Sequence, residues 1–515
     1  MFFQCMKMNA KILCFFCAVM TATWVRAEGT NGPATLAQLR QHLNDIVSQP
    51  KYAAALWGVK VASLDSGKTL FEHNAEKLCS PASNSKLYTV ALALNRLGPD
   101  YRIKTSLYAN AKPDDSGVLK GDLIVYGRGD PTINARLNGG NLYKALGPLI
   151  AALTNAGVKS IEGDIVGDDT FFRGMPYGSG WAWDDLENYY GAEISALTLN
   201  DNYLQVTVRP GESVGAPCTL SLSPATTWVT LSNRTETVAK GGRRRIELFR
   251  PLGENVMYVS GKMPLGEAPY SDDVTLHDPA GLFASFFRDA LIRAGINVKG
   301  GSRSVTSLDV DGHPTNCGEL VELGFVESLP MKDIAREVQK PSQNLYTDLL
   351  LAHVGEKSRT DSSRADETSE DLGLNELNKF LGEAGIKRGD TLFEEGSGLG
   401  RDNLTTPNAT VALLEFMHTN KWYAAYYDSM PIAGVDGTIR NRMKGTPAAG
   451  NLHAKTGTLR WANSLSGYVT SAAGEHLVFS IMLNRFHNAD TRTSSRNDLD
   501  AIGVLLASFS GKSTE

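Results

Sequence analysis

The apolar positions of the first hundred residues predict a β-hairpin followed by a partly buried helix. Between residues 57 and 71, apolar side chains lie on both sides of a Leu-Asp-Ser-Gly turn, an arrangement typical of two antiparallel strands. From Pro81 onward the apolar residues recur at helical spacing, at Leu87, Val90, Ala91, Leu94 and Leu97. Gly98 and Pro99 end this pattern, so we expect a helix that starts near Pro81 and buries one face.

The pattern changes twice along the rest of the chain. Short β-like runs separated by Gly, Pro, Asn and Asp occur at 118–126, 161–166, 204–209 and 245–248. Helical spacing returns at 331–339, 342–354 and 376–384, followed by strand patterns at 463–470 and 475–483 and a closing helix at 499–509. We therefore predict a multidomain α/β chain, in which 28–100 and 311–515 form one discontinuous domain and 101–310 forms inserted β-rich domains.

Residues 1–27 have the layout of a secretory signal peptide. Lys7 and Lys11 precede an apolar run at 12–25, and a Val-Arg-Ala sequence ending at Ala27 offers a cleavage site. The run has about 14 residues, whereas a helix needs about 20 to span a bilayer. We therefore expect cleavage, secretion and no stable membrane anchor afterwards.

Composition limits the classes of function. The 515 residues are 42% hydrophobic and 21% charged, as in soluble globular proteins, and the formal net charge of -5 gives no reason to expect a nucleic-acid partner. The chain has no zinc-binding His-Glu-x-x-His and no phosphate-cradling Gly-rich loop, so we expect neither a metal nor a cofactor. Beyond the leader, Cys79, Cys218 and Cys317 allow at most one disulfide, and the spacing leaves open whether any pair forms it.

A Ser-x-x-Lys motif opens the predicted helix. Ser83 and Lys86 are one helical turn apart, so a helix places the hydroxyl beside the amine. Ser48 and Lys51 have the same spacing, but Pro50 between them would break a helix there. Only the first pair is therefore a candidate nucleophile and base.

Two further motifs follow in order along the chain. Ser342-Gln343-Asn344 comes directly after Pro341, and taken alone it predicts a plain helix N-cap at Ser342. Lys455-Thr456-Gly457-Thr458 lies in an extended stretch, where Gly457 would let a ligand backbone approach a strand edge. Together, the three motifs form the signature set of β-lactamases and penicillin-binding proteins.

The chain resembles the low-molecular-mass class C penicillin-binding proteins, the DacB-like D-alanyl-D-alanine carboxypeptidases/endopeptidases. Ser342 follows Ser83 by 259 residues, which leaves room for the large insertion of that family. Other segments that resemble the family lie at 81–87, 129–132, 180–186, 396–399 and 433–438. Gln343 replaces the Asp of the class A β-lactamase pattern.

The resemblance implies a β-lactamase/transpeptidase-like domain, with a five-stranded antiparallel sheet flanked by helices, and a periplasmic enzyme that acts on peptidoglycan stem peptides and is acylated by β-lactams. It assigns catalytic roles to Ser83, Lys86 and Ser342. The implied substrate-binding residues are Asn344, Lys455, Thr456, Gly457 and Thr458, and the implied oxyanion hole is made of the main-chain N–H groups of Ser83 and Thr458. Segments of the insertion that could reach the cleft carry Asp169, Phe172 and Trp183, which are candidates for recognising the substrate side chain.

The chemistry makes one demand of Lys86. An ordinary lysine has a pKa near 10.4, so at pH 7 only about one in 2500 is neutral and able to accept a proton. A base role therefore requires burial and a nearby like charge, for which Lys455 is the candidate.

Two other functions remain open at this point. In a β-lactamase or esterase of the same fold, Asp371 and Asn375 would loosely imitate a water-activating Glu-x-x-Leu-Asn element. A non-catalytic peptidoglycan-binding protein would keep the fold without turnover. The preference for carboxypeptidase or endopeptidase cleavage, the diamino acid of the stem peptide, the oligomeric state and the rate of deacylation are not determined by the sequence.

Overall fold

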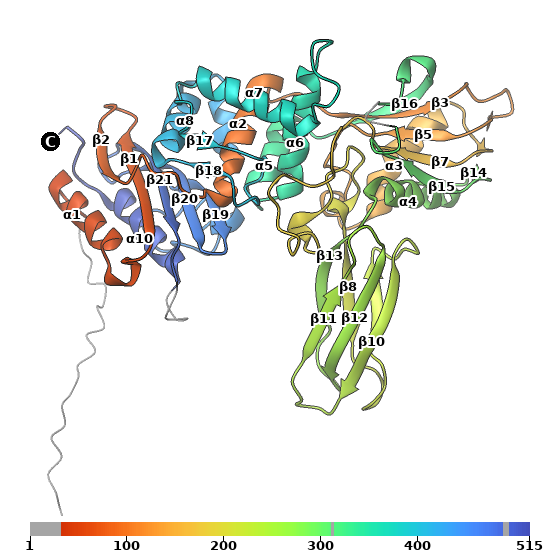
Figure 1. Ribbon diagram of the computed structural model, residues 1–515, viewed down its shortest axis with the longest axis horizontal. Coiled ribbons are helices and arrows are strands. Elements are labelled where there is room, and N and C mark those ends of the chain that lie inside the picture. The colour runs from red at the N-terminus through yellow and green to blue at the C-terminus, as the bar shows by residue number, and fades with distance from the viewer. Residues whose placement is uncertain (1–31, 311–313, 488–493, 515) are drawn as a thin grey trace, which may run out of the picture.

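A five-stranded antiparallel sheet joins the two ends of the chain (Figure 1). The computed structural model describes residues 32–310, 314–487 and 494–514, so the predicted signal peptide lies outside the described residues. The strand order is β19-β20-β21-β1-β2, with β1 (Leu56–Ser63), β2 (Thr69–His73), β19 (His453–Leu459), β20 (Ala462–Thr470) and β21 (His476–Asn484). The predicted hairpin and the predicted strand pair near the C-terminus are thus confirmed.

Helices cover both faces of this sheet. On one face, α1 (Leu36–Val47) and α10 (Ser495–Ser508) share a core with Phe479 of β21. The next residue back, Val478, packs on the other face in the core of α2 (Ser85–Leu97) and α8 (Pro407–Thr419). This alternation of neighbouring side chains between two cores is the period-two pattern of a strand that is covered on both sides.

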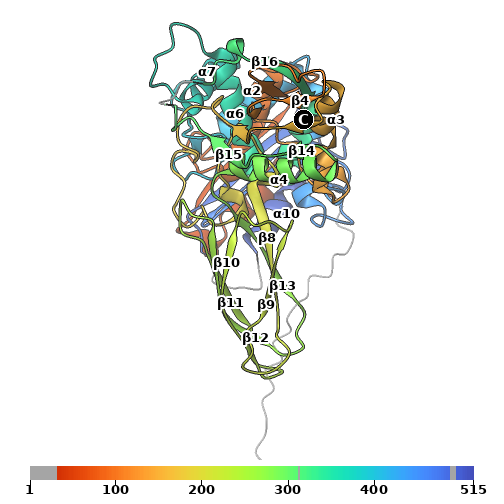
Figure 2. The same ribbon diagram turned by 90° about the vertical axis from the view of Figure 1, so that its right-hand side faces the viewer.

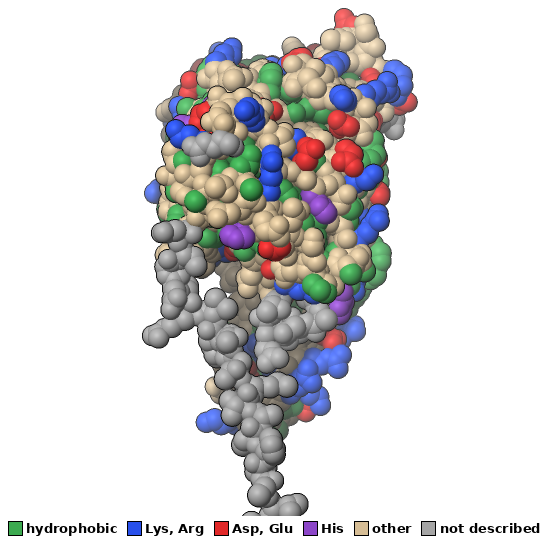
Figure 3. All heavy atoms as spheres, turned by 90° about the vertical axis from the view of Figure 1, so that its left-hand side faces the viewer, with side chains coloured by type: hydrophobic (Ala, Val, Ile, Leu, Met, Phe, Trp, Pro, Cys, Tyr) green, Lys and Arg blue, Asp and Glu red, His purple; other side chains and the backbone are tan. Residues whose placement is uncertain are grey.

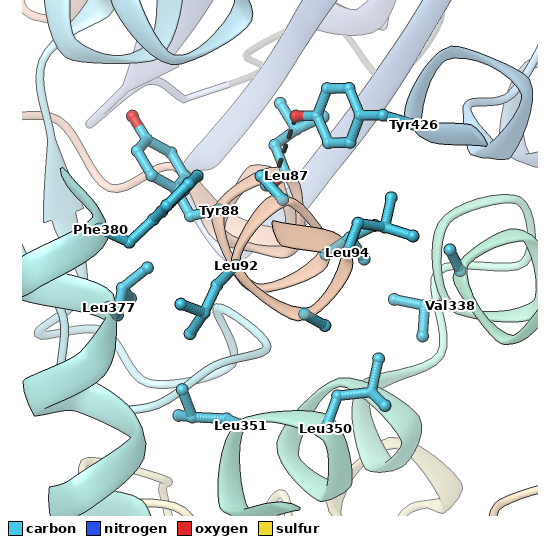
Figure 4. Close-up of a cluster of buried hydrophobic side chains, with 14 of the residues drawn as sticks. Leu87, Tyr88, Leu92, Leu94, Val338, Leu350, Leu351, Leu377, Phe380 and Tyr426 are labelled. Atoms are coloured by element: carbon cyan, nitrogen blue, oxygen red, sulfur yellow. Dashed lines mark hydrogen bonds between the residues drawn. The ribbon is translucent and has the colours of Figure 1, made fainter. Parts of the chain in front are cut away.

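α2 lies at the centre of the helical layer. Every residue from Ser85 to Leu94 is buried, so this part of the helix is buried on all sides and not on one face as predicted. The cause is that other helices also pack against the side of α2 turned away from the sheet, where Leu350 and Leu351 lie (Figure 4). On the side nearer the sheet, Tyr426 donates a 3.1 Å hydrogen bond to the carbonyl of Leu87. The surrounding elements are α5 (Met331–Gln339), α6 (Asn344–Ser358), α7 (Ser369–Glu383), α9 (Tyr423–Ser429) and the short strands β17 (Thr391–Leu392) and β18 (Leu404–Thr405).

A second five-stranded sheet forms the body of the insertion. Its order is β15-β7-β5-β3-β16, with β3 (Lys104–Ala109), β5 (Leu123–Tyr126), β7 (Ile165–Asp168), β15 (Ser302–Val305) and β16 (Val321–Glu327). Because β16 pairs with β3, the insertion continues to Glu327, and the predicted end at 310 was too early. The sheet packs with α3 (Leu142–Asn155) and α4 (Pro279–Arg293), two helices that were not predicted, and a small sheet contains β4 (Val118–Leu119), β6 (Ser160–Ile161) and β14 (Asn297–Val298).

The remaining strands of the insertion form a lobe that projects from the body (Figures 1 and 2). Two three-stranded sheets, β13-β8-β9 and β10-β12-β11, make up this lobe. The strands are β8 (Tyr203–Arg209), β9 (Thr219–Ser223), β10 (Thr230–Val238), β11 (Arg245–Phe249), β12 (Val256–Pro264) and β13 (Tyr270–Thr275). Val206 of one sheet and Val259 of the other are fully buried in the same core, which holds the lobe together.

The three cysteines that could have formed a bridge are all free thiols. Cys79 and Cys218 are buried, and Cys317 is half-buried. Within 32–310, 314–487 and 494–514, no helix is both long and apolar enough to cross a membrane. Basic and acidic side chains are mixed on the visible part of the face that Figure 3 shows.

Candidate active site

The nucleophile candidate lies where three elements meet. Ser83 is in the short 3-10 helix η2 (Ala82–Asn84), which leads into α2 and packs against β19. The Lys86 amine donates a 3.0 Å hydrogen bond to the Ser83 hydroxyl, and Ser83 is half-buried. Ala82, directly before it, has a φ of 48°, a conformation that costs a non-glycine residue about 1–3 kcal/mol. The surrounding packing therefore holds Ser83 in place against local strain.

Lys86 is fully buried and has three hydrogen-bond partners. Besides Ser83, its amine donates to Asn344 Oδ1 and to the carbonyl of Ser397, both at 2.6 Å. Burial lowers the pKa of Lys86 to about 8, although the charges of Asp348 and Glu395 act in the opposite direction. At a pKa of about 8, roughly one molecule in ten has a neutral Lys86 at pH 7. The predicted effect of burial is confirmed, whereas the charges that act most strongly on Lys86 are those of the two carboxylates and not the predicted like charge of Lys455.

Lys455 of β19 is the second fully buried amine. It donates to the Ser342 hydroxyl at 2.8 Å and to the carbonyl of Thr456 at 2.9 Å. Burial, and secondly the charge of Lys86, lower its pKa well below the usual range. The repulsion between the two amines thus favours a state in which one of them is neutral.

Ser342 is not the helix N-cap that its local sequence predicts. Its φ is 68°, and the N-cap position of α6 belongs to Gln343. The Ser342 hydroxyl instead accepts the hydrogen bond from Lys455. This left-handed conformation at a serine is a second point of backbone strain beside the amines.

Asn344 connects the insertion to the candidate catalytic groups. Its Oδ1 accepts from Lys86, and its Nδ2 donates at 2.9 Å to the carbonyl of Tyr190. Tyr190 belongs to the 3-10 helix η4 (Tyr189–Gly191) of the insertion. Because the acceptor is a main-chain carbonyl, no residue type at 190 signals this contact, and sequence reasoning missed it.

The other residues of β19 occupy different environments. The Thr456 hydroxyl is buried and lies 2.7 Å from the hydroxyl of Thr438, whereas Thr458 is exposed. A Cβ atom at Gly457 would lie 2.3 Å from the carbonyl oxygen of Pro81 and 2.2 Å from Ser464 Oγ. The structure thus gives a different reason for Gly457 from the one predicted, since the chain's own backbone approaches it.

A buried glutamate, which sequence reasoning also missed, organises the turn behind Lys86. Glu395 is fully buried and accepts hydrogen bonds from Asn403 Nδ2, from the Ser397 hydroxyl and from the main-chain N–H groups of 397, 398 and 400. These contacts fix the turn whose Ser397 carbonyl accepts from Lys86. The Gly-Ser-Gly-Leu segment at 396–399 was the available signal.

The three insertion residues proposed for side-chain recognition do not come together. Asp169 and Phe172 line a cavity of about 470 Å³ between the insertion and α6–α7, which we call the carboxylate cavity. Asp169 accepts a 2.8 Å hydrogen bond from the Ser195 hydroxyl, and burial raises its pKa to about 7. Trp183 lines a different groove and is 73% exposed.

Two segments that imitate parts of a catalytic motif, at 48–51 and 371–375, have ordinary structural roles. Pro50 starts a 3-10 helix, so Ser48 and Lys51 share no α-helical turn. Asp371 accepts from the backbone and hydroxyl of Thr368 in a capping box at the start of α7, which accounts for its carboxylate without a catalytic role. In the part of the chain that the structure describes, no group of three or more His, Cys, Asp or Glu residues is placed to hold a metal ion.

The sequence of this chain is similar to those of known proteins over most of its length. A family model described as the D-Ala-D-Ala carboxypeptidase 3 (S13) family matches residues 39–505. The D-alanyl-D-alanine carboxypeptidase of Actinomadura sp. (strain R39) is 32% identical over 490 residues, which cover 93% of this chain and 86% of that protein. The D-alanyl-D-alanine carboxypeptidase DacB of Haemophilus influenzae is 26% identical over 442 residues, which cover 85% of this chain and 87% of that protein.

The fold is also that of a solved structure. The crystal structure of penicillin binding protein 4 (dacB) from Haemophilus influenzae matches with a TM-score of 0.74 and 24% identity. The match covers 90% of this chain and 97% of the other. The likeness therefore extends over the insertion as well as the sheet domain.

Proposed function

The chain belongs to the D-Ala-D-Ala carboxypeptidase 3 (S13) family and is a serine-type carboxypeptidase that acts on peptidoglycan, and we propose that Ser83 is its nucleophile. The observation that carries this assignment is the 3.0 Å hydrogen bond between Ser83 and a fully buried amine. Neutral Lys86 takes the proton of the Ser83 hydroxyl, and the oxygen attacks the carbonyl carbon of the penultimate D-alanine.

Ser342 and Lys455 serve the second half of acylation. The C–N bond of the tetrahedral intermediate breaks, and the Ser342 hydroxyl passes a proton to the leaving D-alanine nitrogen. The Lys455 amine, 2.8 Å from Ser342 Oγ, replaces the proton that Ser342 gives up, while Lys86 keeps the proton taken from Ser83 until Ser83 is released. Water then attacks the acyl-enzyme, releases the shortened peptide and restores Ser83.

In this proposal, substrate is held by β19 and by η2, the 3-10 helix that leads into α2. The main-chain N–H groups of Ser83 and Thr458 form the oxyanion hole, and the position of Ser83 at the start of a helix favours negative charge there. Lys455, with Thr456 or Thr458, binds the terminal carboxylate, and Asn344 holds the peptide amide. Gly457 keeps β19 close to Ser83 through its contact with Pro81.

A β-lactam acylates the same hydroxyl. The penicillin binding protein 4 of Haemophilus influenzae has been crystallised in complex with a β-lactam, and this chain shares its fold. We infer that the product of that acylation is long-lived here, since Asp371 caps α7 and is not available to activate water. The enzyme works in the periplasm, after a signal peptide at 1–27 has been removed.

Intact-mass analysis tests this assignment. The mature protein incubated with benzylpenicillin should gain one persistent adduct, and Ser83→Ala should gain none. Hydrolysis of a D-Ala-D-Ala peptide by the wild type, and not by Ser83→Ala, completes the test. Rapid benzylpenicillin hydrolysis without an adduct would instead indicate a β-lactamase, and binding of peptidoglycan without any turnover would indicate a non-catalytic protein.

A further inference from the structure

An open groove lies in the insertion, beside the segment that reaches the catalytic residues. Its volume is about 470 Å³, and its walls come from the segment 183–188, from β11 and from β13. Two of its rings are among the most exposed large apolar side chains of the described residues, since Trp183 is 73% and Phe249 52% exposed. Neighbouring aromatic rings left facing water are a common mark of a binding surface.

Polar groups flank these rings. Asp184 is exposed and Glu187 is half-buried in the same groove. On the β13 side, the Tyr270 hydroxyl donates a 2.7 Å hydrogen bond to Asp272, which fixes that carboxylate. The groove therefore presents flat apolar faces next to hydrogen-bond acceptors.

This combination fits the rings of a sugar. A pyranose has C–H faces that stack on an aromatic ring and hydroxyl and amide N–H groups that donate to carboxylates. A single ammonium group would instead need rings within about 6 Å of one point, whereas this groove has the size of a ligand with several rings. Size thus favours a saccharide over an amine.

The groove is held in a fixed relation to the catalytic residues. The segment that follows Trp183 in the sequence is bound to β13 of the lobe. The Leu186 carbonyl accepts a 2.6 Å hydrogen bond from the Thr275 hydroxyl, and Asn188 forms a β-bridge with Val274. Two residues further on, the Tyr190 carbonyl accepts the hydrogen bond from Asn344. One short segment therefore lines the groove and contacts the catalytic site.

We propose that this groove binds the glycan strand to which the stem peptide is attached. The proposal rests on the proposed function, since only a peptidoglycan peptidase receives its peptide on an N-acetylated amino-sugar polymer. A strand stacked on Trp183 and Phe249 brings its peptides to the cleft as a tethered, locally concentrated substrate. A short soluble peptide lacks the strand and gains nothing from the groove.

Two substrates separate the groove from the chemistry. Phe249→Ala should lower kcat/KM on polymeric peptidoglycan. The double variant, which combines Phe249→Ala with Trp183→Ala, should lower it by about tenfold. Phe249→Ala should leave hydrolysis of a short soluble D-Ala-D-Ala peptide unchanged. Phe325→Ala removes a ring that is 48% exposed on β16 and does not line the groove, so it is the matched control on both substrates.

The outcomes also separate this proposal from the proposed function. If wild type hydrolyses neither substrate, the proposed function fails. If wild type hydrolyses both and the double variant loses nothing on the polymer, or loses equally on both, the glycan groove is refuted while the peptidase stands.

Direct binding gives an independent result. Tetra-N-acetylchitotetraose titrated into the full protein should change the tryptophan fluorescence, and Trp183→Phe should abolish most of that change. A response to 1,5-diaminopentane and not to the tetrasaccharide would overturn the proposal in favour of an amine site.

Discussion

The candidate active site around Ser83 and the carboxylate cavity both bury ionisable groups, and burial shifts their pKa values in opposite directions. In the candidate active site, burial lowers the pKa of Lys86 to about 8. In the cavity, burial raises the pKa values of Asp169 and Glu370 to about 7. Burial disfavours the charged form in each case, so a lysine becomes a base at neutral pH and a carboxyl becomes an acid. Perturbed pKa values alone therefore do not locate catalytic residues, and our assignment of Lys86 depends on its hydrogen bond to Ser83.

The largest expected effect concerns the buried base. Lys86→Met should lower the rate constant of acylation by benzylpenicillin by about 10³-fold, because no group then accepts the Ser83 proton. Stopped-flow or mass-resolved acylation measures it. Lys332→Met removes a lysine on α5 whose side chain is 44% exposed, and it should leave the rate unchanged. An equal loss in both variants would show that Lys86 has no special role.

The pH dependence of acylation sharpens the same contrast. With the pKa of Lys86 at about 8, the rate constant should rise about tenfold per pH unit below pH 8 and level off above it. The charge of Glu395 raises this pKa, so Glu395→Gln should move the midpoint to lower pH. Acylation rates between pH 5 and 10 measure both, and a midpoint that moves upward would contradict the electrostatic argument.

Gly457 tests whether packing positions the nucleophile. Gly457→Ala should destabilise the fold by about 1–3 kcal/mol, because the new Cβ meets the Pro81 carbonyl, and it should slow acylation by displacing Ser83. Gly382 is exposed in α7 with open space around it, so Gly382→Ala should stabilise by about 0.5–1 kcal/mol and leave acylation unchanged. Urea unfolding of both variants gives the comparison, and equal stabilities would remove the steric explanation.

The smallest expected effect on activity comes from the carboxylate cavity. Asp169→Asn should leave acylation within about threefold of wild type, since Asp169 has no contact with the catalytic groups. Its raised pKa means that wild type loses stability as pH rises from about 4 to about 7, by at most about 1.4 kcal/mol per unit. The variant should therefore gain stability relative to wild type between pH 5 and pH 8. Unfolding at the two pH values measures this gain, and a constant difference would contradict it.

Sequence patterns predicted best where one element carries its own signal. The bounds of α5 agree with the predicted 331–339, and Lys86 lies one turn after Ser83 as the helical spacing required. α3 was missed because Gly147 and Pro148 interrupt its sequence, and Pro148 lies inside the helix all the same. Tertiary packing overrides that local penalty, as the burial of Leu142, Leu146, Leu149 and Leu153 shows.

Features that depend on distant partners could not be predicted. β16 forms its sheet with β3, more than 200 residues earlier, so no local pattern indicates that β16 belongs to the insertion. Ser342 has the sequence context of an N-cap, and only the arrival of Lys455 gives its hydroxyl another partner. The Tyr190 carbonyl that holds Asn344 belongs to the backbone, which every residue type shares.

The pairing of β1 with β21 has a consequence for biosynthesis. Leu56 pairs with Asn484 at one end of this ladder, so one strand of the pair is synthesised long before the other. A nascent chain with Ser83 already synthesised still lacks Lys455, β20 and β21 until almost the whole polypeptide has been made. We therefore expect a chain that ends before β21 to lack the complete sheet beside Ser83, and Ser83 to obtain its full surroundings only when the last strands have been added.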